Sequence, residues 1–180
     1  MEKYQELLKL ARESIESEIT PKELKVDEKL KKKYSEKKAC FVTLTIAGKL
    51  RGCIGSLEPR QELWKDVIEN AKNAAFFDSR FLKLTLNELA KIKIEISVLS
   101  IPRKISYKNP EELKKKIKGK GVVLKKDWNS ATYLPLVWKE LQDKNEFLNF
   151  LCKKAGLSGD VWKMEKLEVY TYRSNSVIEN

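Results

Sequence analysis

Residues 50–55 read Leu-Arg-Gly-Cys-Ile-Gly, and the interpretation of the whole chain starts from this hexapeptide. An apolar run over residues 39–46 precedes it, and the β-branched and aromatic residues of that run are typical of a strand. Residues 47–49 between the two read Ala-Gly-Lys, which is the composition of a short turn. The sequence therefore predicts a β-hairpin over residues 39–55 with a three-residue turn.

Side chains alternate between the two faces of a strand, so the predicted hairpin divides the hexapeptide into two sets. Leu50, Gly52 and Ile54 are expected on the apolar face, toward the core. Arg51 and Cys53 are expected side by side on the opposite face. A two-residue turn would change the cross-strand partners of these residues, but it would leave Arg51 beside Cys53.

Hydrophobic periodicity predicts the remaining elements, in an order that mixes helices and hairpins. Helices are expected over residues 2–19, 61–76, 86–90, 109–118 and 144–155, and strands over 91–98, 121–126, 129–134 and 166–173. Residues 22–37 give no decisive pattern. This order is typical of an α+β fold with mainly antiparallel sheets and flanking helices, and a boundary near 101–109 would divide the strands into two groups.

The composition excludes several classes of function. The 180 residues contain no histidine, which removes Ser-His-Asp, Cys-His and His-ligated metal mechanisms. Cys40, Cys53 and Cys152 are too widely spaced for a zinc pattern and odd in number, so we expect reduced thiols, no metal and no cofactor. No apolar stretch approaches the ~18 residues of a membrane span, and the first residues lack a signal-peptide centre. A soluble cytoplasmic protein without membrane contact is expected.

The chain is strongly basic, with a net charge of +11 from 37 Lys and Arg against 26 Asp and Glu. Such a charge invites a nucleic-acid interpretation. However, only six of the basic residues are Arg, the side chain that binds bases and phosphates bidentately. The four tryptophans are spaced too irregularly for a base-stacking platform, and core or interface positions are expected for them. Nucleic-acid binding is therefore the least favoured function.

Two residues of the hexapeptide carry chemistry. Arg51 either pairs with a carboxylate, for which Asp78 and Glu58 are the candidates, or binds an anionic ligand. A cation two residues from Cys53 would lower the pKa of the thiol and favour the thiolate. Cys53 is accordingly the candidate nucleophile, with a buried apolar filler as the alternative.

Other candidate ligand-binding residues surround this pair. Gly52 and Gly55 weaken a strand unless something approaches the backbone closely, which is either a ligand or the helix predicted over 61–76. Asp78 and Arg80 follow that helix and either bind ligand or form an ion pair at its end. From the second group of strands, Tyr133 and Arg173 are candidates to close the site and to bind the ligand.

Several segments in this order resemble the AMMECR domain family, whose prokaryotic members are called AmmeMemoRadiSam system protein A. These segments are the hexapeptide, Phe41–Leu44, Ala74–Phe81 with Leu84-Thr85, Thr132–Pro135 and Tyr172-Arg173. The resemblance covers about residues 1–175, so the chain is expected to be a single AMMECR-like domain over 1–180. It implies two packed sub-domains, about 1–105 and 106–165, with a cleft beside the hexapeptide. A last strand, 166–175, is expected to pack on one of the two sub-domains, and which one is left open. It also implies Memo-type proteins and radical S-adenosylmethionine enzymes as partners in a modification or biosynthetic pathway.

Three functions stay open at this point. In the first, the cleft around the hexapeptide binds an anionic small molecule or peptide, with Arg51 holding the anion and Cys53 acting as nucleophile or covalent carrier. In the second, the chain is a non-catalytic adaptor or regulatory domain that binds another protein. The third is nucleic-acid binding through the lysine-rich surface. The first leaves open whether the chain is an enzyme.

Overall fold

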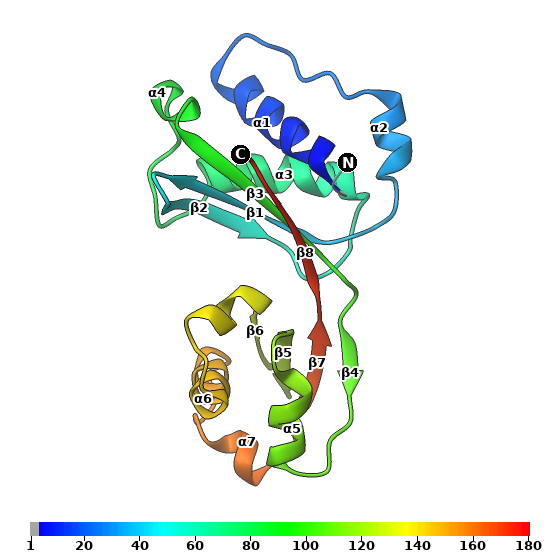
Figure 1. Cartoon of the computed structure of the whole chain (residues 1–180), viewed down its shortest axis with the longest axis vertical. Coiled ribbons are helices and arrows are strands. Elements are labelled where there is room, and N and C mark those ends of the chain that lie inside the picture. Colours follow the sequence, from blue (N-terminus) through cyan, green and yellow to red (C-terminus); the bar gives the residue numbers. More distant parts are fainter. Residues whose placement is uncertain (1–3) are drawn as a thin grey trace. The chain divides into compact units, whose positions relative to one another are not determined.

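The computed structural model describes residues 4–180 and divides the chain into two compact units. Unit 1 comprises the described residues up to Leu99 together with Asn175–Asn180, and unit 2 comprises Ser100–Ser174. Each unit contributes a four-stranded sheet and its own helices, as Figure 1 shows. The predicted α+β class is therefore confirmed.

Unit 1 is a sheet with two long helices on one face. Its elements are α1 (Gln5–Ile19), α2 (Glu28–Lys33), β1 (Cys40–Ile46), β2 (Lys49–Gly55), α3 (Leu63–Phe76), α4 (Leu86–Leu89), β3 (Ile92–Leu99) and β8 (Ser174–Ile178). The strands lie in the order β2-β1-β3-β8, and both β1 pairings are antiparallel. The short helix α2 falls within residues 22–37, where no decisive pattern was found. Its three consecutive lysines complement the negative end of the helix dipole.

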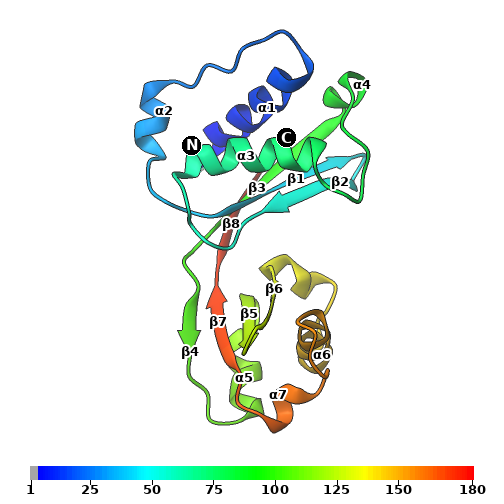
Figure 2. The same cartoon turned by 180° about the vertical axis from the view of Figure 1, so that it is seen from behind.

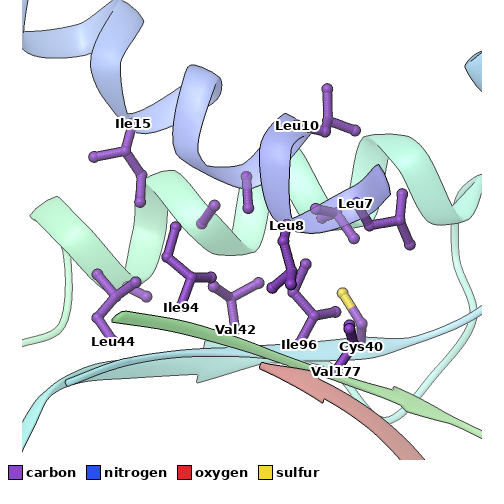
Figure 3. Close-up of a cluster of buried hydrophobic side chains, with 14 of the residues drawn as sticks. Leu7, Leu8, Leu10, Ile15, Cys40, Val42, Leu44, Ile94, Ile96 and Val177 are labelled. Atoms are coloured by element: carbon purple, nitrogen blue, oxygen red, sulfur yellow. The ribbon is translucent and has the colours of Figure 1, made fainter. Parts of the chain in front are cut away.

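The core of unit 1 lies between the sheet and helices α1 and α3. Figure 3 shows apolar side chains of α1 directed at those of β1, β3 and β8. On α3, Ala71, Ala74 and Ala75 are buried, and their small side chains let the helix lie close to the strands beneath it. Each fully buried Leu or Ile here contributes about 1.5–3 kcal/mol relative to an exposed one. The predicted inward-facing residues of β3 are confirmed, because Ile92, Ile94, Ile96 and Val98 are all buried.

The hairpin of β1 and β2 differs from its prediction at the turn. Ile46 pairs with Lys49, so the turn contains two residues, Ala47 and Gly48, with φ of 49° and 77°. Positive φ at both positions gives the backbone twist that suits a tight hairpin. The expected three-residue turn is therefore wrong.

A β-bulge at Arg51 compensates for the shorter turn. Leu44 pairs with Gly52, but Thr45 pairs with Leu50, so Arg51 is the extra residue of β2. Beyond the bulge the predicted faces hold, whereas Leu50 falls on the opposite face from the one expected. Leu50 is 44% exposed, so its predicted place in the core is wrong.

Unit 2 surrounds a second sheet with the order β4-β7-β5-β6. Its elements are β4 (Arg103–Ile105), α5 (Pro110–Ile117), β5 (Gly121–Lys126), β6 (Asn129–Tyr133), the 3-10 helix η1 (Pro135–Lys139), α6 (Lys144–Lys154), α7 (Val161–Met164) and β7 (Glu168–Tyr172). Asn109 and Asp143 cap α5 and α6 by accepting backbone N–H bonds, as expected from the sequence. Trp138 stacks on the buried Phe147 with ring centroids 3.9 Å apart.

The C-terminal strand predicted over residues 166–173 is observed as β7, and a further strand that the sequence did not predict, β8, follows it. β7 pairs with β4 and β5 in the sheet of unit 2, and β8 lies beside β3 in the sheet of unit 1. Only Arg173 separates them. Val177 of β8 is buried in the core of unit 1, so the end of the chain completes that unit.

Candidate functional site

The hexapeptide lies on β2, an edge strand of unit 1, and the connection from α3 to α4 covers that edge. Figures 1 and 2 both show this connection and α4 at the end of the sheet where the hairpin turns. We call residues 77–88 the covering segment. Edge strands expose unpaired backbone groups, and covering them is one way in which proteins prevent uncontrolled pairing.

Both glycines of the hexapeptide are explained by packing. A side chain at Gly52 would overlap the backbone carbonyl of Ala74 on α3. One at Gly55 would overlap the ring of Phe41 and the carbonyl of Cys40. Of the two alternatives left open by the sequence, close approach of the α3 backbone is the one observed at Gly52.

Arg51 joins β2 to the covering segment. Its Nε donates to Glu88 Oε1 at 2.8 Å, and its Nη2 donates to Glu88 Oε2 at 3.1 Å and to the Leu82 carbonyl at 2.9 Å. The Arg51 side chain is only 13% exposed. The partner is thus Glu88, and neither of the expected carboxylates, Asp78 and Glu58, takes that place. Within residues 4–180, Nη1 of Arg51 is buried and has no acceptor.

Glu88 serves two purposes at once. It forms the predicted capping box of α4, accepting from the backbone N–H of Thr85 at 2.9 Å, while it also binds Arg51. These bonds favour the charged carboxylate, and the Arg51 bond contributes most. They lower the pKa of Glu88 to about 2.

Asp78 and Arg80 clamp the backbone of Cys53. Asp78 Oδ2 accepts from the Cys53 N–H at 2.9 Å, and Arg80 Nη2 donates to the Cys53 carbonyl at 3.3 Å. The two side chains also bind each other, with Arg80 Nη2 2.7 Å from Asp78 Oδ2. The Arg80 bond, followed by the backbone bonds, holds the pKa of Asp78 far below its usual range. The ion pair expected at the end of this helix exists, and it also satisfies the edge of β2.

The thiol of Cys53 is less acidic than an ordinary cysteine. Burial is the largest influence on its pKa and raises it, and this outweighs a bond with Thr43, whose Oγ1 lies 3.2 Å from Sγ. The cation that acts on the thiol is Arg80, whereas Arg51 is bound to Glu88. The prediction that Arg51 lowers the pKa of Cys53 is therefore wrong, because the bulge and the ion pair direct the guanidinium elsewhere.

A set of exposed apolar side chains lies on β2 and on the covering segment, the two stretches that these anchored residues join, and the sequence interpretation missed it. It consists of Leu50, Phe77, Leu82 and Leu86, which are 44%, 68%, 88% and 57% exposed. We call these four residues the apolar patch. The sequence carried one signal for it, because three leucines lie close together at positions 82, 84 and 86. Only Leu84 is buried, and Leu82 and Leu86 are exposed.

One cation, Lys83, lies beside a residue of the apolar patch, and a second, Arg80, lies beside another aromatic ring of the covering segment. The Lys83 ammonium lies 5.8 Å from the ring centroid of Phe77, and the Arg80 guanidinium lies 5.4 Å from that of Phe81. The Arg80 side chain is 54% exposed, so it stays accessible although it is bound to Asp78. The arrangement can attract an anionic group while burying apolar surface.

The two remaining candidates lie in unit 2. Tyr133, at the end of β6, packs its ring against Phe147, and Lys154 lies 4.9 Å from its centroid. Arg173 is exposed between β7 and β8, and its backbone exchanges hydrogen bonds with Ser100. Their role in binding ligand stays a prediction.

The described part of the chain also gives two general findings. Residues 4–180 contain no cluster of three or more His, Cys, Asp or Glu side chains placed to hold a metal ion. No helix in the same range is long and apolar enough to span a membrane.

Comparison with known proteins places the chain in a family. The AMMECR1 family model matches residues 8–177. The chain belongs to the AMMECR1 family. This confirms the resemblance seen in the sequence, and the match includes the hexapeptide, the covering segment and all of unit 2.

Relatives of this AMMECR1-family protein extend over nearly its full length. A protein of Nanoarchaeum equitans is 39% identical and covers 92% of this chain and 94% of its own. A protein of Methanosarcina barkeri is 40% identical and covers 86% of this chain and 80% of its own. The crystal structure of uncharacterized protein PH0010 from Pyrococcus horikoshii superposes with a TM-score of 0.87 at 35% identity, covering 98% of this chain and 91% of that one.

Proposed function

We propose that this AMMECR1-family chain is a protein-binding module, and that unit 1 binds a peptide segment of a partner on the apolar patch. The observation that carries the proposal is the exposure of four large apolar side chains on β2 and the covering segment, two stretches that side-chain hydrogen bonds hold together. Soluble proteins rarely expose clustered apolar side chains without using them in contacts.

The scaffold supports binding because it holds the patch in one conformation. The Arg51 bonds fix Glu88 and Leu82, and the Asp78 bonds fix the start of the covering segment against Cys53. A surface ordered before binding loses less conformational entropy when its partner arrives. The charged groups of this region thus stabilise a binding surface, and they do not need to react.

The charges predict the chemistry of the partner. Asp78 and Glu88 are already neutralised by Arg80 and Arg51, so Lys83 is left to attract a partner. A segment with apolar side chains flanked by Asp or Glu fits this surface, because its carboxylates would meet cations at the rim. This is the peptide form of the anionic ligand expected from the sequence.

Thiol catalysis receives less support from the same geometry. Burial raises the pKa of Cys53, the chain contains no histidine, and Arg51 is bound to Glu88. A nucleophilic cysteine needs a lowered pKa or an adjacent base. Capture of an anionic small molecule by Arg51 is weakened too, because two of its nitrogens have protein acceptors and the third is covered.

The partners implied by the family resemblance give the first proteins to test. Memo-type proteins and radical S-adenosylmethionine enzymes of the same pathway would be bound through acidic, apolar segments, in the cytoplasm. The proposal requires only that a partner carries a segment with apolar and acidic side chains.

A random peptide library displayed on phage and selected on the immobilised full chain tests the proposal. Selected peptides should combine Leu, Phe or Ile with Asp or Glu, and Leu82→Ser should weaken their binding at least tenfold, about 1.4 kcal/mol. Ile101→Ser is the matched control, since Ile101 is 66% exposed in unit 2. A selection whose peptides bind wild type and Leu82→Ser equally would overturn the proposal.

A further inference from the structure

Trp128 is the most exposed large apolar residue of unit 2. Its relative exposure is 101%, so the indole makes no protective contact with the rest of the described chain. Folding gains nothing from a tryptophan in this position, since a buried Trp is what contributes to core energetics. The other tryptophans of unit 2 are used internally: Trp162 is buried, and Trp138 donates to the Lys120 carbonyl at 2.8 Å.

The hairpin that presents Trp128 does not require it. Lys126 pairs with Asn129, so Asp127 and Trp128 form the two-residue turn between β5 and β6. Asp127 has a φ of 51°, which an Asp tolerates better than most residues. Turns of this kind favour Asn, Asp and Gly for their backbone conformations, and a large aromatic residue has no such advantage.

A second exposed apolar residue lies near the same end of unit 2. The Lys126 ammonium lies 2.6 Å from Glu165 Oε2, and Glu165 directly follows Met164, which is 71% exposed. We call Asp127 and Trp128 the hairpin tip. An apolar centre bordered by charged groups of both signs, here Lys126, Asp127 and Glu165, is the composition of a protein interface.

Unit 2 also carries most of the charge of the chain. Residues 100–174 contain 17 Lys and Arg against nine Asp and Glu, a net charge of +8 of the total of +11. A unit with this charge attracts acidic surfaces and accelerates their association.

We infer that the hairpin tip is a second protein-binding site, on which Trp128 inserts into an apolar pocket bordered by acidic residues on a partner protein. Exposed Trp is the residue type most enriched among those that dominate binding energies. The mixed charges favour a protein over a polyanion. Lys126 neutralises Glu165, but Asp127 directly adjoins Trp128 and would repel the continuous phosphates of a nucleic acid or an anionic lipid surface. A folded partner can instead match each charge separately.

This inference is independent of the apolar patch in unit 1. Together, the two surfaces would let one chain hold two partners, which is the property of an adaptor. Each of the two binding sites can be tested without the other.

The experiment places a photoreactive benzoylphenylalanine at position 128 of the full chain in living source cells, with the same residue at position 101 as the control. Ile101 is also exposed and lies in unit 2. We expect irradiation to link position 128, and not position 101, to a discrete protein. The purified partner should then bind Trp128→Ser at least tenfold more weakly than wild type, and Trp128→Phe should retain most of the affinity.

Three results would overturn the inference. One is cross-linking at position 128 only to nucleic acid or lipid. Another is the absence of a discrete adduct, or equal adducts at both positions. The third is a cross-linked protein whose affinity is unchanged by Trp128→Ser. Because Trp128 is fully exposed, none of these variants should disturb the fold.

Discussion

Glu88 shows how one residue can organise a surface. Its carboxylate caps α4, binds Arg51 and thereby fixes the position of Leu82. Sequence reasoning predicted the cap, which is local, but it assigned Arg51 to other carboxylates. The ion pair joins residues 37 positions apart, and no local pattern encodes such a distance.

We expect Glu88→Gln to lower the free energy of unfolding at neutral pH by about 2 kcal/mol, because it leaves the Arg51 cation without its counter-charge. The pKa of Glu88 falls from an ordinary 4.5 to about 2 in the folded chain. The pair therefore stabilises the fold fully above about pH 4.5 and loses this contribution as the pH falls toward 2.

Urea unfolding of wild type and Glu88→Gln as a function of pH checks this prediction. The difference in stability between them should shrink on acidification through that interval. A difference that stays constant down to the acid limit would contradict the assigned pKa and the ion pair.

Cys53 should react slowly with alkylating agents. Burial raises the pKa of its thiol, so its thiolate fraction at neutral pH is below that of free cysteine. Iodoacetamide labelling, followed peptide by peptide in a mass spectrometer, should show a rate for Cys53 below that of glutathione. Cys40 is fully buried and gives an internal reference for a protected thiol. A rate above that of glutathione would restore the nucleophile interpretation.

At the scale of elements, the sequence predicted most helices and strands because their signals are local. Apolar periodicity located α1, α3 and β3, and side-chain caps located the starts of α5 and α6. The bulge in β2 was missed, since an extra residue in one strand depends on what the strand packs against. The apolar patch was missed for a related reason: a pattern of leucines does not show which of them the fold leaves uncovered.

Gly52 tests the contact between β2 and α3. Gly52→Ala should destabilise the chain by about 3 kcal/mol, because its methyl group would overlap the Ala74 carbonyl and force the helix away from the sheet. Gly159→Ala is the matched control. Its added methyl would meet mainly the flexible Lys153 side chain, with Cε at 3.0 Å. Equal losses of thermal stability in the two variants would show that α3 does not approach Gly52 as described.

At the scale of the whole molecule, the chain returns to unit 1 after completing unit 2. Val177 is buried in the unit 1 core, and Glu179 binds Arg12 of α1. Sequence reasoning left open which group of strands receives the C-terminal strand. The one strand that it expected there is β7, and it missed β8 in the other sheet, because the polar residues 174–176 carry no apolar alternation.

A chain that ends at Ser174 should have a destabilised unit 1 and an intact unit 2. Hydrogen exchange should accelerate at the amides of β3, which loses its neighbour β8, and should stay unchanged in β5. Val177→Ala in the full chain provides a milder version, with a cost of about 2 kcal/mol. Faster exchange in β5 by the same factor would contradict the division into two units.

The most direct test of the central claim compares two substitutions in one binding measurement. A peptide selected on the wild-type chain is titrated against Leu82→Ser and Cys53→Ser, and the dissociation constants are determined by fluorescence anisotropy. If the surface formed by the apolar patch is the site, Leu82→Ser weakens binding at least tenfold and Cys53→Ser leaves it within about twofold of wild type. Loss of binding in Cys53→Ser, with binding by Leu82→Ser unaffected, would contradict the account and would indicate that the Cys53 thiol is the functional group.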